Sequence, residues 1–286
     1  MASQFTPYAP IGALSNNDVF AVEQRTGRAY GKDYRYYVAT CKDGAEYRLR
    51  SVTSVLGVLN KEALIQWAVD QGMDYIRERV DYDADGVARF TQPDLEALLR
   101  KARMAHYRTK TEAAERGTIA HDYVEQFLRT GQEQDMSDQD PRVANCYDLF
   151  RRWWDQAGLS VIQTELLVYH APLGYAGQLD FLAADADGQP VLVDWKTGKS
   201  IYWDYKLQVV AYAKALHAMG RGVTSAIRIV RIGCEDAEFE VKEIPRDDWK
   251  HLGQLFEACI PLSDAFRDAK KEYRKRPRRK AGNVAA

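Results

Sequence analysis

The first half of the chain places its hydrophobic residues at the spacing of helices. Leu64, Trp67, Ala68 and Ile76 recur every three or four positions or their multiples, which predicts an amphipathic helix. Helices are predicted over four stretches in all: residues 59–80, 93–116, 118–130 and 141–157. We expect a break between the second and the third at Gly117, because glycine is a poor helix former.

The second half changes to short runs of apolar and β-branched residues, which are typical of strands. Asp187-Gly188 lies between two such runs and predicts a hairpin turn. A similar hairpin around Lys42-Asp43-Gly44, within residues 29–49, is interpreted as an accessory layer. The predicted strands cover 161–170, 175–185, 190–197, 225–233 and 237–244, with helices over 203–218 and from Asp247 onward. This order predicts an α/β fold in which helices flank a central mixed β-sheet.

The composition bounds the class of protein. With 286 residues, 46% hydrophobic and 28% charged, the chain fits one large domain or two smaller ones with a buried core. No apolar run approaches the ~18 residues that a membrane-spanning helix needs. The first residues lack a basic segment followed by an apolar one, so we expect no secretory signal. A cytoplasmic protein, of a bacterium or a phage-infected host cell, is therefore expected, with no membrane partner.

Charge is distributed unevenly along the chain. Residues 267–280 hold nine lysines and arginines against Asp268 and Glu272, a local net charge of +7, whereas the whole chain carries −1. A basic segment on an acidic body attracts phosphate backbones. A solvated tail that aids solubility has the same composition, and both interpretations stay open for this basic C-terminal tail, residues 267–286.

The cysteines offer no metal-binding pattern. Cys41, Cys146, Cys234 and Cys259 are widely separated, and no pair has the spacing C-x-x-C. We expect them to be free, and mostly buried as small apolar residues.

Three charged residues stand in strands that otherwise read as buried. Asp194 and Lys196 are two residues apart, so they project from one face of a strand, whereas Trp195 projects from the other. The Asp187-Gly188 turn pairs this strand with the one that carries Asp180. Buried charges are costly unless they are paired or bound to a metal. One interpretation is an internal salt bridge; the other is a divalent cation held by carboxylates, beside a lysine that positions or deprotonates a water.

Short motifs around these residues resemble the RecB-type exonuclease branch of the PD-(D/E)xK nuclease superfamily. The likeness spans residues 51–232 and rests on five motifs in a fixed order, although Leu179 stands where the superfamily's name has a proline. Residues from Ser51 resemble the S-V-T-x-(I/V)-L segment of phage exonucleases and of mitochondrial genome maintenance exonuclease. The other four are Arg116-Gly117-Thr118 with His121 and Glu125 (R-G-T-x-x-H-x-x-x-E), Gly177-Gln178-Leu179-Asp180 (G-x-x-D), Asp194-Trp195-Lys196-Thr197-Gly198 (D-x-K-T-G), and Gln208 with Tyr212 (Q-x-x-x-Y).

The resemblance implies a restriction-endonuclease-like core around a metal centre. Its implied ligands are His121, Asp180, Asp194 and the backbone carbonyl of Trp195, and a histidine suits Mn²⁺ as well as Mg²⁺. Lys196 is implied to orient the attacking water and to stabilise charge on the phosphate. No iron–sulfur cluster is expected, because the early and late cysteines of the branch's cluster-bearing members have no counterpart in this sequence.

The remaining matches imply supporting roles. Glu165 is similar to an extra acidic residue that supports a metal or its water, and we count it with the catalytic residues. Gln208 and Tyr212 are implied either to contact nucleic acid or to prop the site. Arg116 is implied to hold a phosphate. Glu125 is expected behind the ligands, although a histidine and a glutamate four residues apart on a helix are usually a surface contact.

The sequence thus predicts three regions: an accessory hairpin region (1–50), a nuclease domain (51–266, with a helical part 51–158 and a catalytic α/β core 159–266), and the basic tail. The leading hypothesis is a metal-dependent DNA exonuclease that acts on single-stranded ends in phage-type recombination, replication or repair. Its expected partners are DNA, single-stranded or with duplex ends, and a single-strand-binding or recombination protein. A structure-specific endonuclease or nickase of the same fold and a non-catalytic DNA-binding module are the alternatives. Tyr202, Trp203 and Tyr205 either stack on bases or are ordinary helix packing.

Overall fold

The computed structural model describes residues 6–29, 32–59, 61–222, 224–236 and 238–275. These residues form two compact units. The first comprises Met1–Leu59, Arg152–Gly233 and Glu238–Ala286, and the second comprises Asn60–Arg151 and Cys234–Ala237.

The first unit is built on one mixed eight-stranded sheet in the order β1-β2-β3-β5-β6-β7-β8, with β4 paired to β5. The pairs β3·β5 and β6·β7 are parallel, and the other pairs are antiparallel. The strands are β1 (Val19–Ala29), β2 (Lys32–Cys41), β3 (Glu46–Ser51), β4 (Ser160–His170), β5 (Tyr175–Ala184), β6 (Pro190–Lys196), β7 (Ala226–Ile232) and β8 (Phe239–Glu243). The predicted α/β fold with a central mixed sheet and flanking helices is confirmed.

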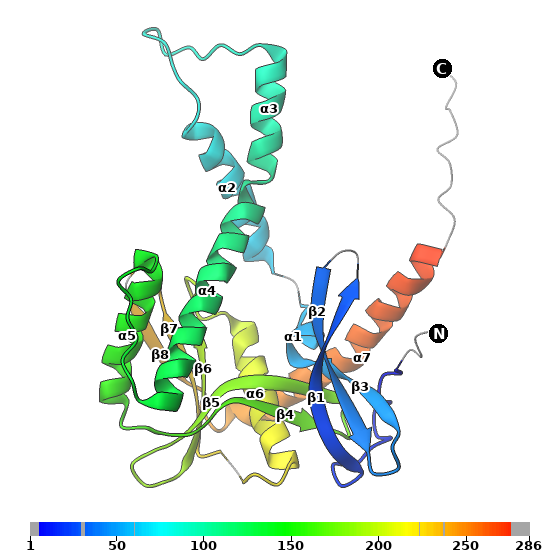
Figure 1. The fold of residues 1–286 in the computed structure, drawn as a ribbon. Helices are drawn as coiled ribbons and strands as arrows, with labels where there is room; N and C mark the ends of the chain where they lie inside the picture. The colour runs from blue at the N-terminus through cyan, green and yellow to red at the C-terminus, as the bar shows by residue number, and fades with distance from the viewer. Residues whose placement is uncertain (1–5, 30–31, 60, 223, 237, 276–286) are drawn as a thin grey trace. The chain divides into compact units, whose positions relative to one another are not determined.

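Three helices of this unit pack against the sheet and one another: α1 (Val52–Leu56), α6 (Trp203–Ala218) and α7 (Asp248–Lys275) (Figure 1). Nine of the sixteen residues of α6 are buried, from Leu207 to Leu216. A helix with apolar residues all round belongs in a core, and α6 accordingly lies between the sheet and α7. The helix that follows the D-x-K-T-G motif is thereby held rigidly against β4 to β7.

The N-terminal strands belong to the same sheet as the rest of this unit. We expected an accessory hairpin over residues 29–49, but β1 adds a third strand, and β3 pairs in parallel with β5 through Arg50 and Ser51. The guanidinium of Arg50 is buried, and it donates hydrogen bonds to the Asp264 carboxylate on α7 and to the carbonyls of Ala9 and Gly174. This network fastens the N-terminal segment to the core, which the local pattern of a hairpin cannot reveal.

The second unit is helical, with α2 (Glu62–Arg77), α3 (Gln92–Arg103), α4 (Ala105–Thr130) and the first part of α5 (Pro141–Ala157). The expected break at Gly117 is wrong: α4 runs through Gly117, and the break between helices lies at Met104. Gly117 is buried in α4, so packing compensates for its low helix propensity of about 1 kcal/mol relative to alanine. The expected end of the helix at Gly131 is confirmed by its left-handed conformation, with φ 69°.

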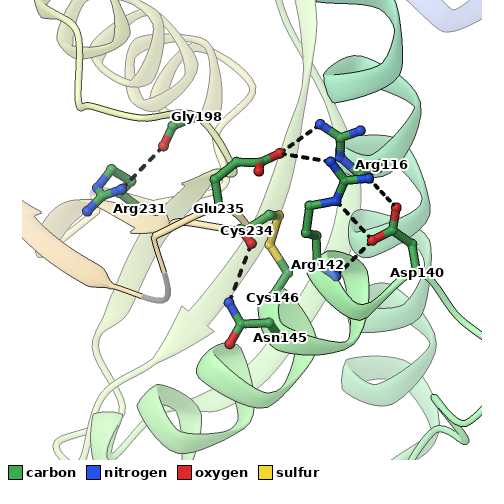
Figure 2. The surroundings of a disulfide bond; sticks show 9 residues. All are labelled: Arg116, Asp140, Arg142, Asn145, Cys146, Gly198, Arg231, Cys234 and Glu235. Atoms are coloured by element: carbon green, nitrogen blue, oxygen red, sulfur yellow. Dashed lines mark hydrogen bonds and ion pairs between the residues drawn. A yellow bond between two sulfur atoms is a disulfide. The ribbon is translucent and has the colours of Figure 1, made fainter. Parts of the chain in front are cut away.

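A disulfide joins Cys146 on α5 to Cys234, with 4.8 Å between their Cα atoms (Figure 2). The expectation that all four cysteines are free is therefore wrong for this pair. The two residues are 88 positions apart, and their proximity depends on the tertiary fold, which spacing in the sequence cannot show. Cys41 and Cys259 are unbridged and buried, as expected.

The last helix, α7, ends at Lys275. The basic tail expected over residues 267–286 thus begins as helix, and residues 276–286 lie outside the described part of the chain. None of the helices within the described residues is both long enough and apolar enough to cross a membrane.

Candidate active site

Asp194 and Lys196 project from the end of β6 toward the first half of α6. The Lys196 ammonium lies 2.7 Å from Oδ2 of Asp194, because residues two apart on a strand share a face. Trp195 packs on the other face, with its ring 6.2 Å from that of Phe181. Alternation along a single strand therefore separates the two charged groups from the aromatic residue between them.

Asp180 reaches the same point from β5. The antiparallel register pairs Phe181 with Val193, so Asp180 lies across from the end of β6. Its Oδ2 accepts a hydrogen bond of 2.8 Å from the backbone N–H of Trp195. Asp180 thus contacts the peptide group that joins Asp194 to Trp195. The carbonyl of Trp195 lies in the next peptide group, between Trp195 and Lys196.

The electrostatics of this cluster are those of two buried carboxylates and one ammonium group. Burial raises the pKa of the Asp180 carboxyl, against the opposing effects of Lys196 and the Trp195 N–H. Burial alone lowers the pKa of Lys196, but the carboxylates of Asp194 and Asp180 outweigh it, and the net shift is upward. Charged groups in such a buried setting are costly unless they are paired or bound to a metal.

This donor set fits a hard divalent cation. Carboxylate and carbonyl oxygens are the ligands that Mg²⁺ prefers, and Mg²⁺ keeps several waters and needs only one or two carboxylates. Asp180, Asp194 and the Trp195 carbonyl would hold the ion. Within the described ranges, no three or more His, Cys, Asp or Glu side chains gather as a metal-binding group.

Glu165 lies on β4, the strand that pairs with β5 on the side away from β6. Its neighbours Thr164 and Leu166 pair with Phe181 and Leu179, which places Glu165 opposite Asp180. Its backbone is in the left-handed region, with φ 46°, a conformation that non-glycine residues rarely adopt outside functional or strained sites. The register thus places the backbone of the predicted extra acidic residue across from Asp180, while its role stays a prediction.

Gln208 and Tyr212, both on α6, lie next to Asp194 of β6. Their side chains are buried, with 9% and 3% of the residue surface exposed. The Gln208 amide donates to the Tyr212 hydroxyl at 3.0 Å and lies 3.5 Å from Oδ1 of Asp194. Of the two roles that the resemblance left open, this burial supports propping the site rather than a direct nucleic-acid contact.

Gly177 explains how Tyr212 comes so close to the sheet. A Cβ atom at Gly177 would overlap Cε1 of Tyr212 and lie 3.2 Å from its Cδ1. The Tyr212 ring of the Q-x-x-x-Y motif therefore packs directly against the backbone of Gly177 in the G-x-x-D motif. The sequence contained both motifs, but only the packing of α6 on β5 reveals that they touch.

Arg231 lies next to Lys196 on the neighbouring strand, and the sequence patterns did not single it out. It pairs in register with Lys196 across the parallel strands β6 and β7. Its buried guanidinium lies 3.5 Å from the carbonyl of Gly198, in the loop that follows Lys196. Two arginines, Arg228 and Arg231, in an otherwise apolar strand were the available signal, since a buried charge needs a partner.

His121, Glu125 and Arg116 lie together on α4, in the second unit. Arg116 donates a hydrogen bond of 2.7 Å to Glu235, beside the Cys146–Cys234 disulfide, and Arg142 also approaches Glu235 (Figure 2). His121 and Glu125 are partly buried, one helical turn apart. The aspartates belong to the first unit, so a shared metal centre with His121 stays a prediction.

Comparison with known proteins finds a family match for the part of the chain that contains Asp180 and Asp194. Residues 154–281 match the family model described as PD-(D/E)XK nuclease superfamily. No curated protein sequence matches the chain.

Solved structures give remote likenesses. One is a provisionally named exonuclease from Eubacterium rectale, with 10% identity and a TM-score of 0.39, covering 58% of this chain and 76% of that one. Another is LHK-Exo in complex with dAMP, with 13% identity and a TM-score of 0.36, covering 79% of this chain and 91% of that one.

Proposed function

Because residues 154–281 belong to the PD-(D/E)XK nuclease superfamily, we propose that this nuclease is a divalent-metal-dependent DNA exonuclease of the RecB type. The observation that carries the proposal is the convergence of Asp180, in the middle of β5, with Asp194 and Lys196 at the end of β6. The same three residues form an ion-paired cluster, which is the alternative that the sequence left open. The superfamily match favours a catalytic cluster over a purely structural one.

In this proposal the protein's own residues position the reactants. Asp180, Asp194 and the Trp195 carbonyl hold Mg²⁺ or Mn²⁺, which supplies charge for phosphodiester hydrolysis when bound. The Lys196 ammonium, held by Asp194, is placed to orient a water and to stabilise negative charge that develops on the phosphate. Gln208 and Tyr212 fix the orientation of Asp194 from behind. His121, Glu165 and Arg116 keep their proposed roles as a further ligand, a support for the metal or its water, and a phosphate contact.

The proposed substrate is the end of a DNA strand, single-stranded or exposed at a duplex end. The phage-like segment after Ser51 supports a role in recombination, replication or repair, with a single-strand-binding or recombination protein as partner. Both points rest on the resemblance of the motifs, since fold alone does not specify a pathway.

The decisive experiment is digestion of end-labelled single- and double-stranded DNA with Mg²⁺ or Mn²⁺. Lys196→Ala should lower kcat by at least about 100-fold, the loss typical for a group that stabilises transition-state charge. Lys199→Ala is the matched control, because Lys199 is an exposed lysine three residues further along the same segment. Hydrolysis by Lys196→Ala at the rate of the unsubstituted protein would refute the assignment.

Covalently closed circular DNA separates the alternatives. An exonuclease leaves the closed circle intact, whereas a structure-specific endonuclease or nickase converts it to open or linear forms. A non-catalytic DNA-binding module would cut neither substrate, and calorimetry would then show no Mg²⁺ or Mn²⁺ binding that depends on Asp194.

A further inference from the structure

Three aromatic residues, Tyr202, Trp203 and Tyr205 (the aromatic platform), lie at the start of α6, and Tyr205 adjoins the catalytic lysine. The Lys196 ammonium lies 5.0 Å from the centre of the Tyr205 ring, a cation–π distance. The Tyr202 ring meets the Tyr205 ring edge-on, with 5.5 Å between their centres and an interplanar angle of 79°. A continuous path of contacts thus leads from Lys196 through Tyr205 to Tyr202.

The three rings differ in burial, and the difference separates support from contact surface. Tyr205 is partly buried and packs against the hydrophobic core of the first unit. Tyr202 and Trp203 are 40% and 52% exposed. Packing against the core accounts for Tyr205, whereas much of the surface of Tyr202 and of Trp203 is exposed to solvent.

The side chain of Tyr202 does not cap the N-terminus of α6. Tyr202 is the N-cap residue of α6, and its side chain makes no capping hydrogen bond. Serine, threonine, aspartate and asparagine are favoured at this position because their side chains accept bonds from the first N–H groups. The Tyr202 side chain is therefore held by its contact with Tyr205 and not by a cap of α6.

We propose that Tyr202 and Trp203 form a stacking subsite for one unpaired nucleobase next to the phosphate that is cut. This inference rests on the proposed nuclease function and specifies its substrate. A phosphate within reach of Lys196 is joined through one deoxyribose to the neighbouring base, and the Tyr202 ring lies no further from the lysine than two ring contacts. Aromatic side chains bind single strands in this way, with little dependence on sequence, because every base has a π face.

The subsite selects strand state rather than sequence. A base inside a duplex has both faces covered by its neighbours, so its face is accessible to Tyr202 and Trp203 only in a single strand or at a frayed end. The preferred substrate is therefore DNA with at least one unpaired base at the position of cleavage.

The test pairs Trp203→Ala and Tyr202→Ala with abasic substrates. Single-stranded oligonucleotides carry a tetrahydrofuran abasic residue at the terminal or the penultimate position of either end, and kcat/KM is measured for each with the full-length protein. The unsubstituted protein should cut one of these abasic substrates about 5- to 150-fold more slowly than the natural strand, the range expected for loss of one stacked base. Trp203→Ala or Tyr202→Ala should slow the natural strand by a similar factor while leaving that abasic substrate unaffected.

Two controls make the result specific. Trp203→Phe should restore most of the rate, because phenylalanine also stacks, and thermal melting should show that the variants are folded. Phe20→Ala, which removes a 78% exposed ring on the edge strand β1, should cut every substrate normally.

Equal rates for both alanine variants and the unsubstituted protein on the natural strand would overturn the stacking subsite and leave the nuclease intact. The same holds for an equal loss on natural and abasic strands. Absence of any DNA cleavage by the unsubstituted protein with Mg²⁺ or Mn²⁺ would instead overturn the proposed nuclease function, and the subsite with it.

Discussion

The contact between Gly177 and Tyr212 allows a sharp test of how the site is held together. In Gly177→Ala the new methyl carbon would lie closer than 3.0 Å to the Tyr212 ring, a separation that real Cβ atoms essentially never show. Carbon atoms pack at about 3.5–4.0 Å, so the ring must move by roughly 1 Å. The Tyr212 hydroxyl would carry the Gln208 amide with it, and Gln208 is the neighbour of Asp194.

Two magnitudes follow from this displacement. Overpacking a well-packed core costs about 1–3 kcal/mol of unfolding free energy, which at about 2–4 °C per kcal/mol lowers Tm measurably for a chain of this size. A misplacement of about 1 Å in a catalytic group costs up to about 100-fold in rate. We expect kcat to fall by about 10- to 100-fold with KM little changed, because Gly177 is buried and cannot itself contact DNA.

The assay combines steady-state DNA hydrolysis with thermal and denaturant unfolding. Gly253→Ala is the control, because a Cβ there would lie 3.8 Å from Cγ1 of Val210, an ordinary contact. It should keep full activity and gain up to about 1 kcal/mol, since alanine is favoured over glycine in a helix. Adding Tyr212→Leu to Gly177→Ala should recover part of the lost stability, as coupled neighbours do. Normal kcat and Tm in Gly177→Ala would show that the two motifs do not position each other.

Two further predictions concern stability. Asp264→Asn should lower the unfolding free energy by about 3 kcal/mol, because it leaves the buried Arg50 guanidinium without its carboxylate partner. The control Asp268→Asn, at a side chain that is 61% exposed, should change the unfolding free energy by less than about 0.5 kcal/mol. Equal effects of the two variants would show that the Arg50 pair is not a structural anchor. Replacing Cys146 and Cys234 by serine should lower the unfolding free energy by about 2–4 kcal/mol under oxidising conditions and by much less when a reductant is present. Denaturant titrations with and without dithiothreitol measure the two losses. An equal loss under both conditions would assign the effect to packing.

Local patterns predicted most of the elements and the central pair of the site. The hairpin turn at Asp187-Gly188 and the two-residue spacing of Asp194 and Lys196 depend only on strand geometry, and the structure has both. The end of a helix at Gly131 follows from one residue's left-handed conformation. Each of these features is encoded within a few residues, so sequence alone is sufficient.

Features that depend on distant contacts were not predictable in the same way. The parallel pairing of β3 with β5 and the disulfide between Cys146 and Cys234 join segments about 90 to 125 residues apart, and nothing local specifies them. The continuity of α4 through Gly117 depends on packing, which overrides propensity. The role of Gly177 required knowledge of which face of α6 lies against β5.

The disulfide also changes the covalent topology of the molecule. It closes a ring of backbone that contains β4, β5, β6, α6 and β7, and thereby every residue from Glu165 to Tyr212 that we assign to the aspartate site. A protease that cuts once anywhere between Cys146 and Cys234 would leave a single covalent molecule, which separates into two pieces only when a reductant opens the bridge. Cleavage outside the ring would release a fragment at once, so electrophoresis with and without reductant would locate a nick relative to the catalytic segment.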